Sequence, residues 1–251
     1  MVELRPNRAK NKIHSGQVAA VVGGHMTSDI IDFMGPMGFD GAWIEGEHGP
    51  VDYKDIPDLT RACDLWGLTS VVRVNLNLPG VIYRTLDLGA QSICVPHVNT
   101  AEEARAVVDA GKFAPVGHRG MYSSRQGVGI DDFIDVANEQ SMLIILIEDI
   151  VAINNLDEIL EVENIDVFFV ATGDLAQSMG HPGQINHSEV LATTKKANRK
   201  IVDAGKVAGA TVTDANLQSA LDMGCRFVLT QWTPWVSSGG RAFLENVAKA
   251  I

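Results

Sequence analysis

The feature that most constrains the fold is an alternation of two patterns along the whole chain. Eight short runs, rich in apolar and β-branched residues, are separated by segments with helical periodicity. The runs are nearly continuously apolar, which is typical of strands in a parallel sheet that is covered on its outer face. We predict strands at Val18–Val22, Gly41–Glu45, Thr69–Val74, Ser92–Val95, Leu143–Glu148, Val167–Val170, Val207–Ala210 and Phe227–Thr230.

The intervening segments carry helix signals. Thr100 and Glu103 have the spacing of a capping box, and Gly67 and Gly205 mark helix ends. About eight β–α units indicate a (β/α)₈ barrel, with a doubly wound open sheet as the competing architecture. No composition shift divides residues 1–251, so we expect a single barrel domain. Helices are predicted at Tyr53–Trp66, Val81–Leu88, Ala101–Ala110, Ile153–Val162, Ser188–Ala204, Asp214–Met223 and Gly240–Lys249.

Composition excludes several classes of function. The formal net charge is −11, which argues against nucleic acid or an anionic membrane as a partner. Cys63, Cys94 and Cys225 are scattered and lack CxxC spacing, as expected for reduced thiols in the cytoplasm. The segment Met1–His14 is polar, without the apolar stretch of a secretion signal, and no apolar run is long enough to span a membrane. We therefore expect a cytoplasmic protein.

Charged side chains follow the apolar runs where strands end. Gly41–Pro50 passes from an apolar run into Glu45, Glu47 and His48, then breaks at Gly-Pro. Arg73 lies near the end of the third strand, and an arginine inside a buried strand needs an anionic partner. Since barrel enzymes place their catalytic groups at the carboxyl ends of the strands, these residues are expected to meet there.

Two further acids point to a metal site at the same end. Glu148 and Asp149 end the fifth strand, and Asp174 follows the sixth. Carboxylates from different strands form a hard-oxygen site suited to Mg²⁺ or Mn²⁺, which could bind a 2-oxo acid and stabilise its enolate. Arg73 would balance the negative charge. His48 could move a proton, with Glu45 fixing its orientation.

Each of these residues has an ordinary structural interpretation too. Glu148 could be a solvated carboxylate on the barrel rim, Asp174 a helix N-cap, and His48 a turn residue. Two other histidines, His25 and His97, also follow strands and could line the pocket. The remaining candidates, His14, His181 and His187, are expected at the surface or in loops.

Other ways to stabilise an enolate have less support. No lysine falls at the carboxyl end of a predicted strand, and Lys206 lies at the opposite end, which disfavours a Schiff-base aldolase. The glycine-containing segment Ser237–Arg241 is only a weak candidate for binding phosphate. The segment Lys112–Gly129 exceeds an ordinary connection, and loops of that length are usually lids or interface arms.

Taken in order, the segments Gly41–Pro50, Val72–Asn75, Gly117–Gly120, Ile147–Glu148 and Asp174–Gly180 resemble the HpcH/HpaI aldolases, which are class II pyruvate aldolases. The resemblance runs from about Asn7 to the C-terminus. It implies a (β/α)₈ barrel whose C-terminal helix is exchanged with a neighbour, in a homo-hexamer built from dimers.

The resemblance also assigns roles to residues. It implies that Glu148 and Asp174 bind a divalent cation (Mg²⁺, Mn²⁺ or Co²⁺) and that His48 is the base, assisted by Glu45. It implies that Arg73, Gly173 and Asp174 contact the substrate.

Three positions depart from the family pattern. Leu146 stands where many members have Gln, Ala171-Thr172-Gly173 replaces Gly-Pro-Ala, and Glu45 replaces an Asp. None of these departures removes a metal ligand, but together they alter the hydrogen-bonding pattern of the pocket.

We expect a metal-dependent lyase that reversibly cleaves 4-hydroxy-2-oxo acids to pyruvate and an aldehyde. One alternative is a related lyase for a CoA thioester or a phosphorylated oxo acid, for which Arg119, Arg125 and Arg241 are the candidate anion-binding residues. The other alternative, of a different class, is a non-catalytic barrel used for sensing or scaffolding.

Overall fold

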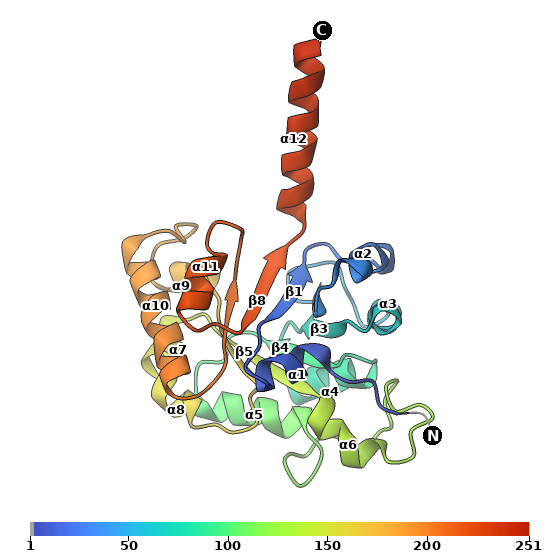
Figure 1. Ribbon diagram of the computed structural model, residues 1–251. Coiled ribbons are helices and arrows are strands. Elements are labelled where there is room, and N and C mark those ends of the chain that lie inside the picture. Colours follow the sequence, from blue (N-terminus) through green and yellow to red (C-terminus); the bar gives the residue numbers. More distant parts are fainter. Residues whose placement is uncertain (1–2, 251) are drawn as a thin grey trace.

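The computed structural model describes residues 3–250 and contains a closed barrel of eight parallel strands in sequence order (Figure 1). The open-sheet alternative is therefore excluded, because β1 pairs with β8 as well as with β2. The strands are β1 Ala19–Gly23, β2 Gly41–Glu45, β3 Thr69–Arg73, β4 Ser92–Val95, β5 Met142–Ile147, β6 Val167–Val170, β7 Ala208–Thr211 and β8 Phe227–Gln231.

All eight predicted strands are present, and three of them, β2, β4 and β6, have the predicted bounds. The ends of the other five differ from the prediction by one residue. At Glu148 the strand stops because the chain turns there into the next helix, so this carboxylate lies just beyond the ladder. The apolar runs thus predicted where each strand lies, and backbone pairing determined the residues at which each strand begins and ends.

Helices cover the barrel, and their bounds agree less closely with the sequence patterns. The segment Ile153–Val162 was predicted as one helix but forms two short ones around Asn155. Four helices, α1, α2, α6 and α9, were not predicted. The helices are α1 Arg8–His14, α2 Ser28–Met34, α3 Ile56–Trp66, α4 Pro79–Asp87, α5 Ala101–Gly111, α6 Phe133–Gln140, α7 Ile150–Asn154, α8 Leu156–Leu160, α9 Thr172–Ser178, α10 Ser188–Asp203, α11 Leu217–Asp222 and α12 Thr233–Ala250, with a 3₁₀ turn at Gly35–Met37.

Alternate side chains of each strand fill the barrel. Trp43, Phe169 and Phe227 meet inside it, with ring centroids 5.8 Å apart for the first pair and 6.2 Å for the second. Gly209 of β7 makes room for them, since a Cβ there would lie 2.5 Å from the Phe169 ring. The interior is thus packed with side chains, as in other barrels of this size.

Helix α1 closes the amino-terminal end of the barrel (Figure 1). Its Ala9 and Ile13 join the interior cluster. Asn7 caps the helix by accepting a hydrogen bond from the Lys10 amide, and its side-chain amide donates to the carbonyl oxygens of Gln91 and Gln140. The polar N-terminal segment is therefore part of the folded barrel.

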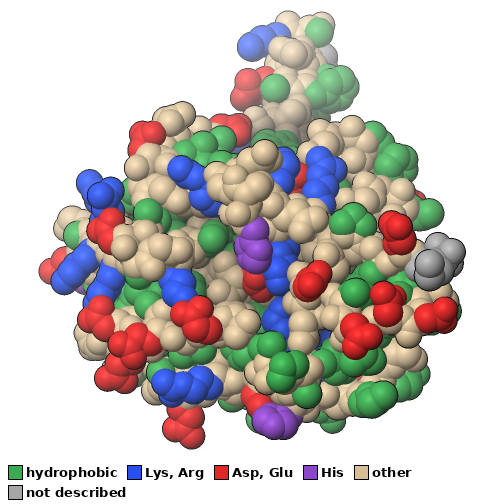
Figure 2. All heavy atoms as spheres, turned by 60° about the horizontal axis from the view of Figure 1, so that its bottom comes forward, with side chains coloured by type: hydrophobic (Ala, Val, Ile, Leu, Met, Phe, Trp, Pro, Cys, Tyr) green, Lys and Arg blue, Asp and Glu red, His purple; other side chains and the backbone are tan. Residues whose placement is uncertain are grey.

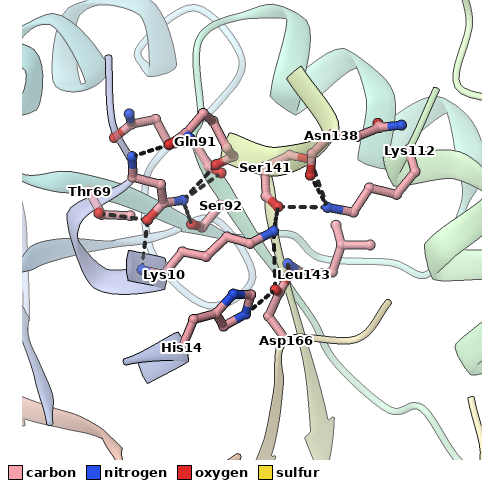
Figure 3. Close-up of polar contacts among 12 residues, drawn as sticks. Lys10, His14, Thr69, Gln91, Ser92, Lys112, Asn138, Ser141, Leu143 and Asp166 are labelled. Atoms are coloured by element: carbon pink, nitrogen blue, oxygen red, sulfur yellow. Dashed lines mark hydrogen bonds and ion pairs between the residues drawn. The ribbon is translucent and has the colours of Figure 1, made fainter. Parts of the chain in front are cut away.

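A buried polar cluster joins α1 to the starts of β5 and β6 (Figure 3). The ammonium groups of Lys10 and Lys112 both donate to the carbonyl oxygen of Ser141, at 2.8 Å and 2.7 Å. Asp166 lies 3.2 Å from the Lys10 ammonium. Burial lowers the pKa of Lys112 to about 7, and the neighbouring Lys10 charge acts in the same direction.

The long connection after α5 lies at this amino-terminal end too. Arg119 pairs with Asp87 at the end of α4 at 2.6 Å, and Arg125 pairs with Asp64 of α3 at 2.7 Å. Of the two roles expected for Lys112–Gly129, a lid over the carboxyl end of the barrel is excluded, because a connection from a helix to the next strand arrives at the amino end, and the role of an interface arm stays a prediction. Figure 2 shows the molecule with the bottom of Figure 1 forward, a face where basic and acidic side chains are interspersed.

Helix α12 projects away from the barrel (Figure 1). None of its residues is buried, and Phe243 and Leu244 are 67% and 65% exposed. Near its start, the Trp235 ring stacks on Phe39 at 6.1 Å between centroids. Within residues 3–250, no helix combines the length and apolar character needed to cross a membrane.

Replacing Lys112 by Met tests the buried cluster. The pKa of Lys112 is about 7 in the folded protein against 10.5 ordinarily, so the unfolded state binds more protons between these values. The wild-type free energy of unfolding should therefore rise with pH in this window relative to Lys112→Met, by up to about 4 kcal/mol. Urea unfolding at several pH values measures this difference, and parallel pH profiles would contradict the burial of a charged Lys112.

Candidate active site

The two-residue period of the strands carries charged side chains to the carboxyl end of the barrel. Glu45 follows Trp43 on the interior side of β2, and Arg73 follows Val71 on that of β3. Glu45 and Arg73 are partners in the β2–β3 register, so their side chains emerge side by side. The same alternation continues from Leu146 to Glu148 just after β5.

Arg73 is held by two carboxylates, which confirms that it needed an anionic partner. Its Nε donates to Glu45 at 2.8 Å and 3.0 Å, and its Nη2 lies 2.7 Å from the same carboxylate. Its Nη1 lies 2.8 Å from Oε2 of Glu47. Glu47 was noticed in the sequence but was given no role, because only the folded chain returns it toward Arg73.

The two carboxylates differ in electrostatic environment. Burial alone would raise the pKa of Glu45, but the hydrogen bonds and charge of Arg73 outweigh it, and the pKa is lowered. For Glu47 burial prevails over the attraction of Arg73, and the pKa is raised. Glu45 is therefore the firmly ionised partner of Arg73.

Glu148 lies deeper than the other acids, with 2% of the residue exposed. Burial, together with the negative charges of Asp174 and Glu47, raises its pKa to about 7 against the effect of His97. Asp174 lies in the first turn of α9, half-buried, beside Gly173, where a Cβ would meet no atom within 4 Å. The effect of the Asp174 charge on this pKa shows that the two acids lie near each other.

His48 is arranged differently from the expectation that Glu45 orients its ring. Oε1 of Glu45 accepts hydrogen bonds from the backbone amides of Glu47 and His48, at 2.8 Å and 3.1 Å. With Arg73 also bound, Glu45 has no contact with the imidazole. The acid beside the ring is Glu47, 3.7 Å from Nε2, and the His48 side chain is 64% exposed.

His97, which the sequence marked only as one of several histidines after strands, lies between two of these acids. Its backbone N–H donates to Oε1 of Glu148 at 2.8 Å, and its Nδ1 is 3.5 Å from the same oxygen. Its Nε2 is 3.6 Å from Oε1 of Glu47. The only advance signal was its place two residues after β4.

The donor set at this end suits a hard divalent cation. Oε2 of Glu148 is buried and has no hydrogen-bond partner, a costly state for a carboxylate oxygen unless a ligand binds it. Glu148 and Asp174 supply only oxygen, which favours Mg²⁺ or Mn²⁺.

A different group, His181, His187 and Glu189, has ligand atoms within 4.8 Å of one another. Its two imidazole rings stack at 3.7 Å between centroids, so their in-plane lone pairs run parallel and do not converge on one ion.

A cavity of about 520 Å³ opens beside Glu45 and His48. Its walls include apolar groups such as Trp43 and Met26, and polar groups at the ends of β1 and β8, including His25 and Gln231. The charged array therefore borders a space large enough for a small organic substrate.

Comparison with known proteins agrees with this geometry. The HpcH/HpaI aldolase/citrate lyase family matches residues 24–228. The chain belongs to this family. The relatives it matches are named as aldolases, so it is an enzyme, a carbon–carbon lyase of the aldolase type. The non-catalytic interpretation of the HpcH/HpaI barrel is thereby set aside.

Relatives of this HpcH/HpaI aldolase include two named groups. It is 38% identical over 202 residues to the hydroxypyruvate/pyruvate aldolase of Roseobacter denitrificans, covering 78% of this chain and 79% of the relative. It is 36% identical to the 2-keto-3-deoxy-L-rhamnonate aldolase of Salmonella gallinarum, covering 80% and 78%. A crystal structure of a family member from Burkholderia cenocepacia matches with a TM-score of 0.90 at 25% identity, covering 96% of this chain and 99% of that one.

Removing the Arg73 side chain tests how the acids are held. Arg73→Ala leaves Glu45 and Glu47 adjacent and without their cation, so we expect the free energy of unfolding to fall by about 2 kcal/mol at neutral pH. Arg61→Ala, at an exposed position of α3, is the control and should change stability by less than about 0.5 kcal/mol. Equal stability of the two variants would show that the ion pairs add nothing.

Proposed function

We propose that this enzyme is a metal-dependent class II aldolase that reversibly cleaves 4-hydroxy-2-oxo acids to pyruvate and an aldehyde. The observation that carries the proposal is the buried Oε2 of Glu148, which lacks a hydrogen-bond partner, in an acid whose pKa is raised by the charge of Asp174. Such an oxygen pair next to an arginine suits a 2-oxo acid, whose two adjacent oxygens can complete the coordination of a divalent cation.

Each residue contributes a separate part of the chemistry. Glu148 and Asp174 would hold the cation, which supplies Lewis-acid polarisation of the keto group. Arg73, fixed on one side by Glu45 and Glu47, would direct its remaining N–H donors at the pyruvyl oxygens. Gly173 would leave the approach to the cation open.

His48 is suited to proton transfer at the mouth of the pocket. Its ring is largely exposed, and its Nε2 lies 3.7 Å from a carboxylate oxygen of Glu47. In the cleavage direction His48 would accept the proton of the 4-hydroxyl group as the C3–C4 bond breaks, and that proton would then pass to C3 of the enolate to give pyruvate. In the addition direction the proton removed from the methyl group of pyruvate would pass through His48 to the new alkoxide.

The cavity beside Glu45 supports an aldehyde site. It offers apolar walls and the polar side chains of His25 and Gln231, a combination suited to short hydroxylated aldehydes. The relatives act, by name, on hydroxypyruvate or pyruvate and on 2-keto-3-deoxy-L-rhamnonate, and we extend this class of small 2-oxo acids to the present enzyme.

A CoA thioester or phosphorylated substrate has less support. Two of its three candidate arginines, Arg119 and Arg125, are paired with acids at the amino-terminal end of the barrel, away from the proposed chemistry. Arg241 lies on α12, which projects away from the barrel.

The oligomeric state, domain organisation and cellular location of the enzyme are also proposed here. We infer a homo-hexamer in which α12 is exchanged with a neighbour, because its apolar side chains are exposed in the single chain. Residues 1–251 would form one domain, since α12 follows β8 directly. The three cysteines are free and buried, which fits a cytoplasmic location.

Metal binding and activity should be lost together. Glu148→Ala and Asp174→Ala are expected to remove Mn²⁺ binding in calorimetry and to reduce retro-aldol release of pyruvate by at least a factor of about 1,000. Glu158→Ala, on the exposed face of α8, is the matched control and should keep both. Full turnover of the EDTA-treated wild type would contradict the proposal.

Removing residues 240–251 tests the helix exchange. The truncation deletes exposed apolar side chains without touching the core, so the barrel should stay folded while the assembly loses mass in light scattering. The double substitution Phe243→Ser and Leu244→Ser should act in the same direction. An unchanged mass for both variants would exclude α12 as the interface.

A further inference from the structure

His97 adopts a backbone conformation that most side chains avoid. Its φ angle is 53°, in the left-handed region, although it is not a glycine. Such a residue costs on the order of 1 kcal/mol or more and persists only where its surroundings over-determine it. Glycine would adopt the same backbone without this cost, so contacts of the imidazole itself must offset it.

The left-handed turn has two geometric consequences. It directs the His97 N–H at Oε1 of Glu148, with a hydrogen bond of 2.8 Å. It also places the ring between two carboxylates, with Nδ1 3.5 Å from Glu148 and Nε2 3.6 Å from Glu47. Backbone and side chain of one residue therefore act on the same oxygen of Glu148.

This arrangement completes a continuous polar array across four neighbouring strand ends. Arg73 contacts Glu47 at 2.8 Å, Glu47 lies beside His97, and His97 contacts Glu148. Without the ring, Glu47 and Glu148 would face each other as like charges, and the charge of Glu47 already acts on Glu148. The array thus connects Arg73 to the buried carboxylate of Glu148.

We propose that His97 is a positioning residue that engages Oε1 of Glu148 and so presents the buried Oε2 to the divalent cation. The proposal rests on the proposed function, because it requires Glu148 to bind metal. Outer residues that orient a ligand in this way typically change metal affinity by a factor of about 10 to 100.

The test measures Mn²⁺ affinity of the metal-free protein by calorimetry, without substrate. His97→Gly keeps the N–H and relieves the backbone, and His97→Asn tolerates the same φ, but both lose the bridging ring. We expect Mn²⁺ binding to weaken at least about tenfold in both variants, while the metal-free proteins keep the circular dichroism spectrum of the folded wild type. Wild-type affinity in both variants would overturn the proposal.

Controls separate positioning from other effects. His118→Asn alters an exposed histidine of the loop after α5 and should leave Mn²⁺ affinity unchanged. If His97 acts through the array, Glu47→Gln combined with His97→Gly should weaken binding by less than the product of the two single effects. A full product would assign the two residues independent roles and overturn the coupling.

Kinetics and one further variant complete the design. The His97 variants should recover kcat at saturating Mn²⁺, because the ligand itself is intact, whereas a loss of kcat that Mn²⁺ does not restore would contradict a positioning role. Glu148→Ala should abolish Mn²⁺ binding. If Glu148→Ala binds Mn²⁺ normally, the proposed metal site fails, whatever the His97 variants do.

Discussion

The alternation of side chains along the barrel strands is the constraint on which the site depends. Interior positions are apolar through the barrel and become charged where the strands end, at Glu45, Arg73 and Glu148. Because strand register is fixed by pairing, Glu45 and Arg73 emerge together and need no loop to bring them into contact. The apolar packing beneath them, centred on Trp43 and Phe169, holds the charged layer in place.

Burial and charge divide the acids of this layer into two kinds. Glu45 is compensated by Arg73 and has a lowered pKa, whereas Glu148 is buried near other acids and has a pKa raised to about 7. A barrel that kept Glu148 without a cation would carry an uncompensated buried acid. In the proposed function a divalent cation would compensate this acid. Glu47 and His97 lie between these two environments and connect them.

Particular residues show how far the sequence could be interpreted. The strand Gly41–Glu45 and the anionic partner of Arg73 could be predicted, because an apolar run marks a buried strand and a buried arginine requires an acid. Helix α1 could not, since only Ala9 and Ile13 of its residues are apolar and hydrogen bonds of Asn7 and Lys10 to distant segments add to its anchoring. The segment Lys112–Gly129 was expected to be a lid or an interface arm, and its length alone could not say at which end of the barrel it lies.

The sequence by itself determined the eight alternating strands and helices, the parallel sheet and the charged residues at the strand ends, whereas the pairing of β1 with β8 closed the sheet into a barrel. These follow from local patterns, since the period of apolar residues and the position of strand ends are readable along the chain. Only the tertiary structure decided which acid contacts which partner. Glu45 accepts hydrogen bonds from Arg73 and from the His48 amide, and Glu47 lies near the His48 ring. The backbone N–H of His97 donates to Glu148. Such pairings depend on distances of a few ångströms between strands and loops that are far apart in sequence, and closure of the barrel fixes those distances.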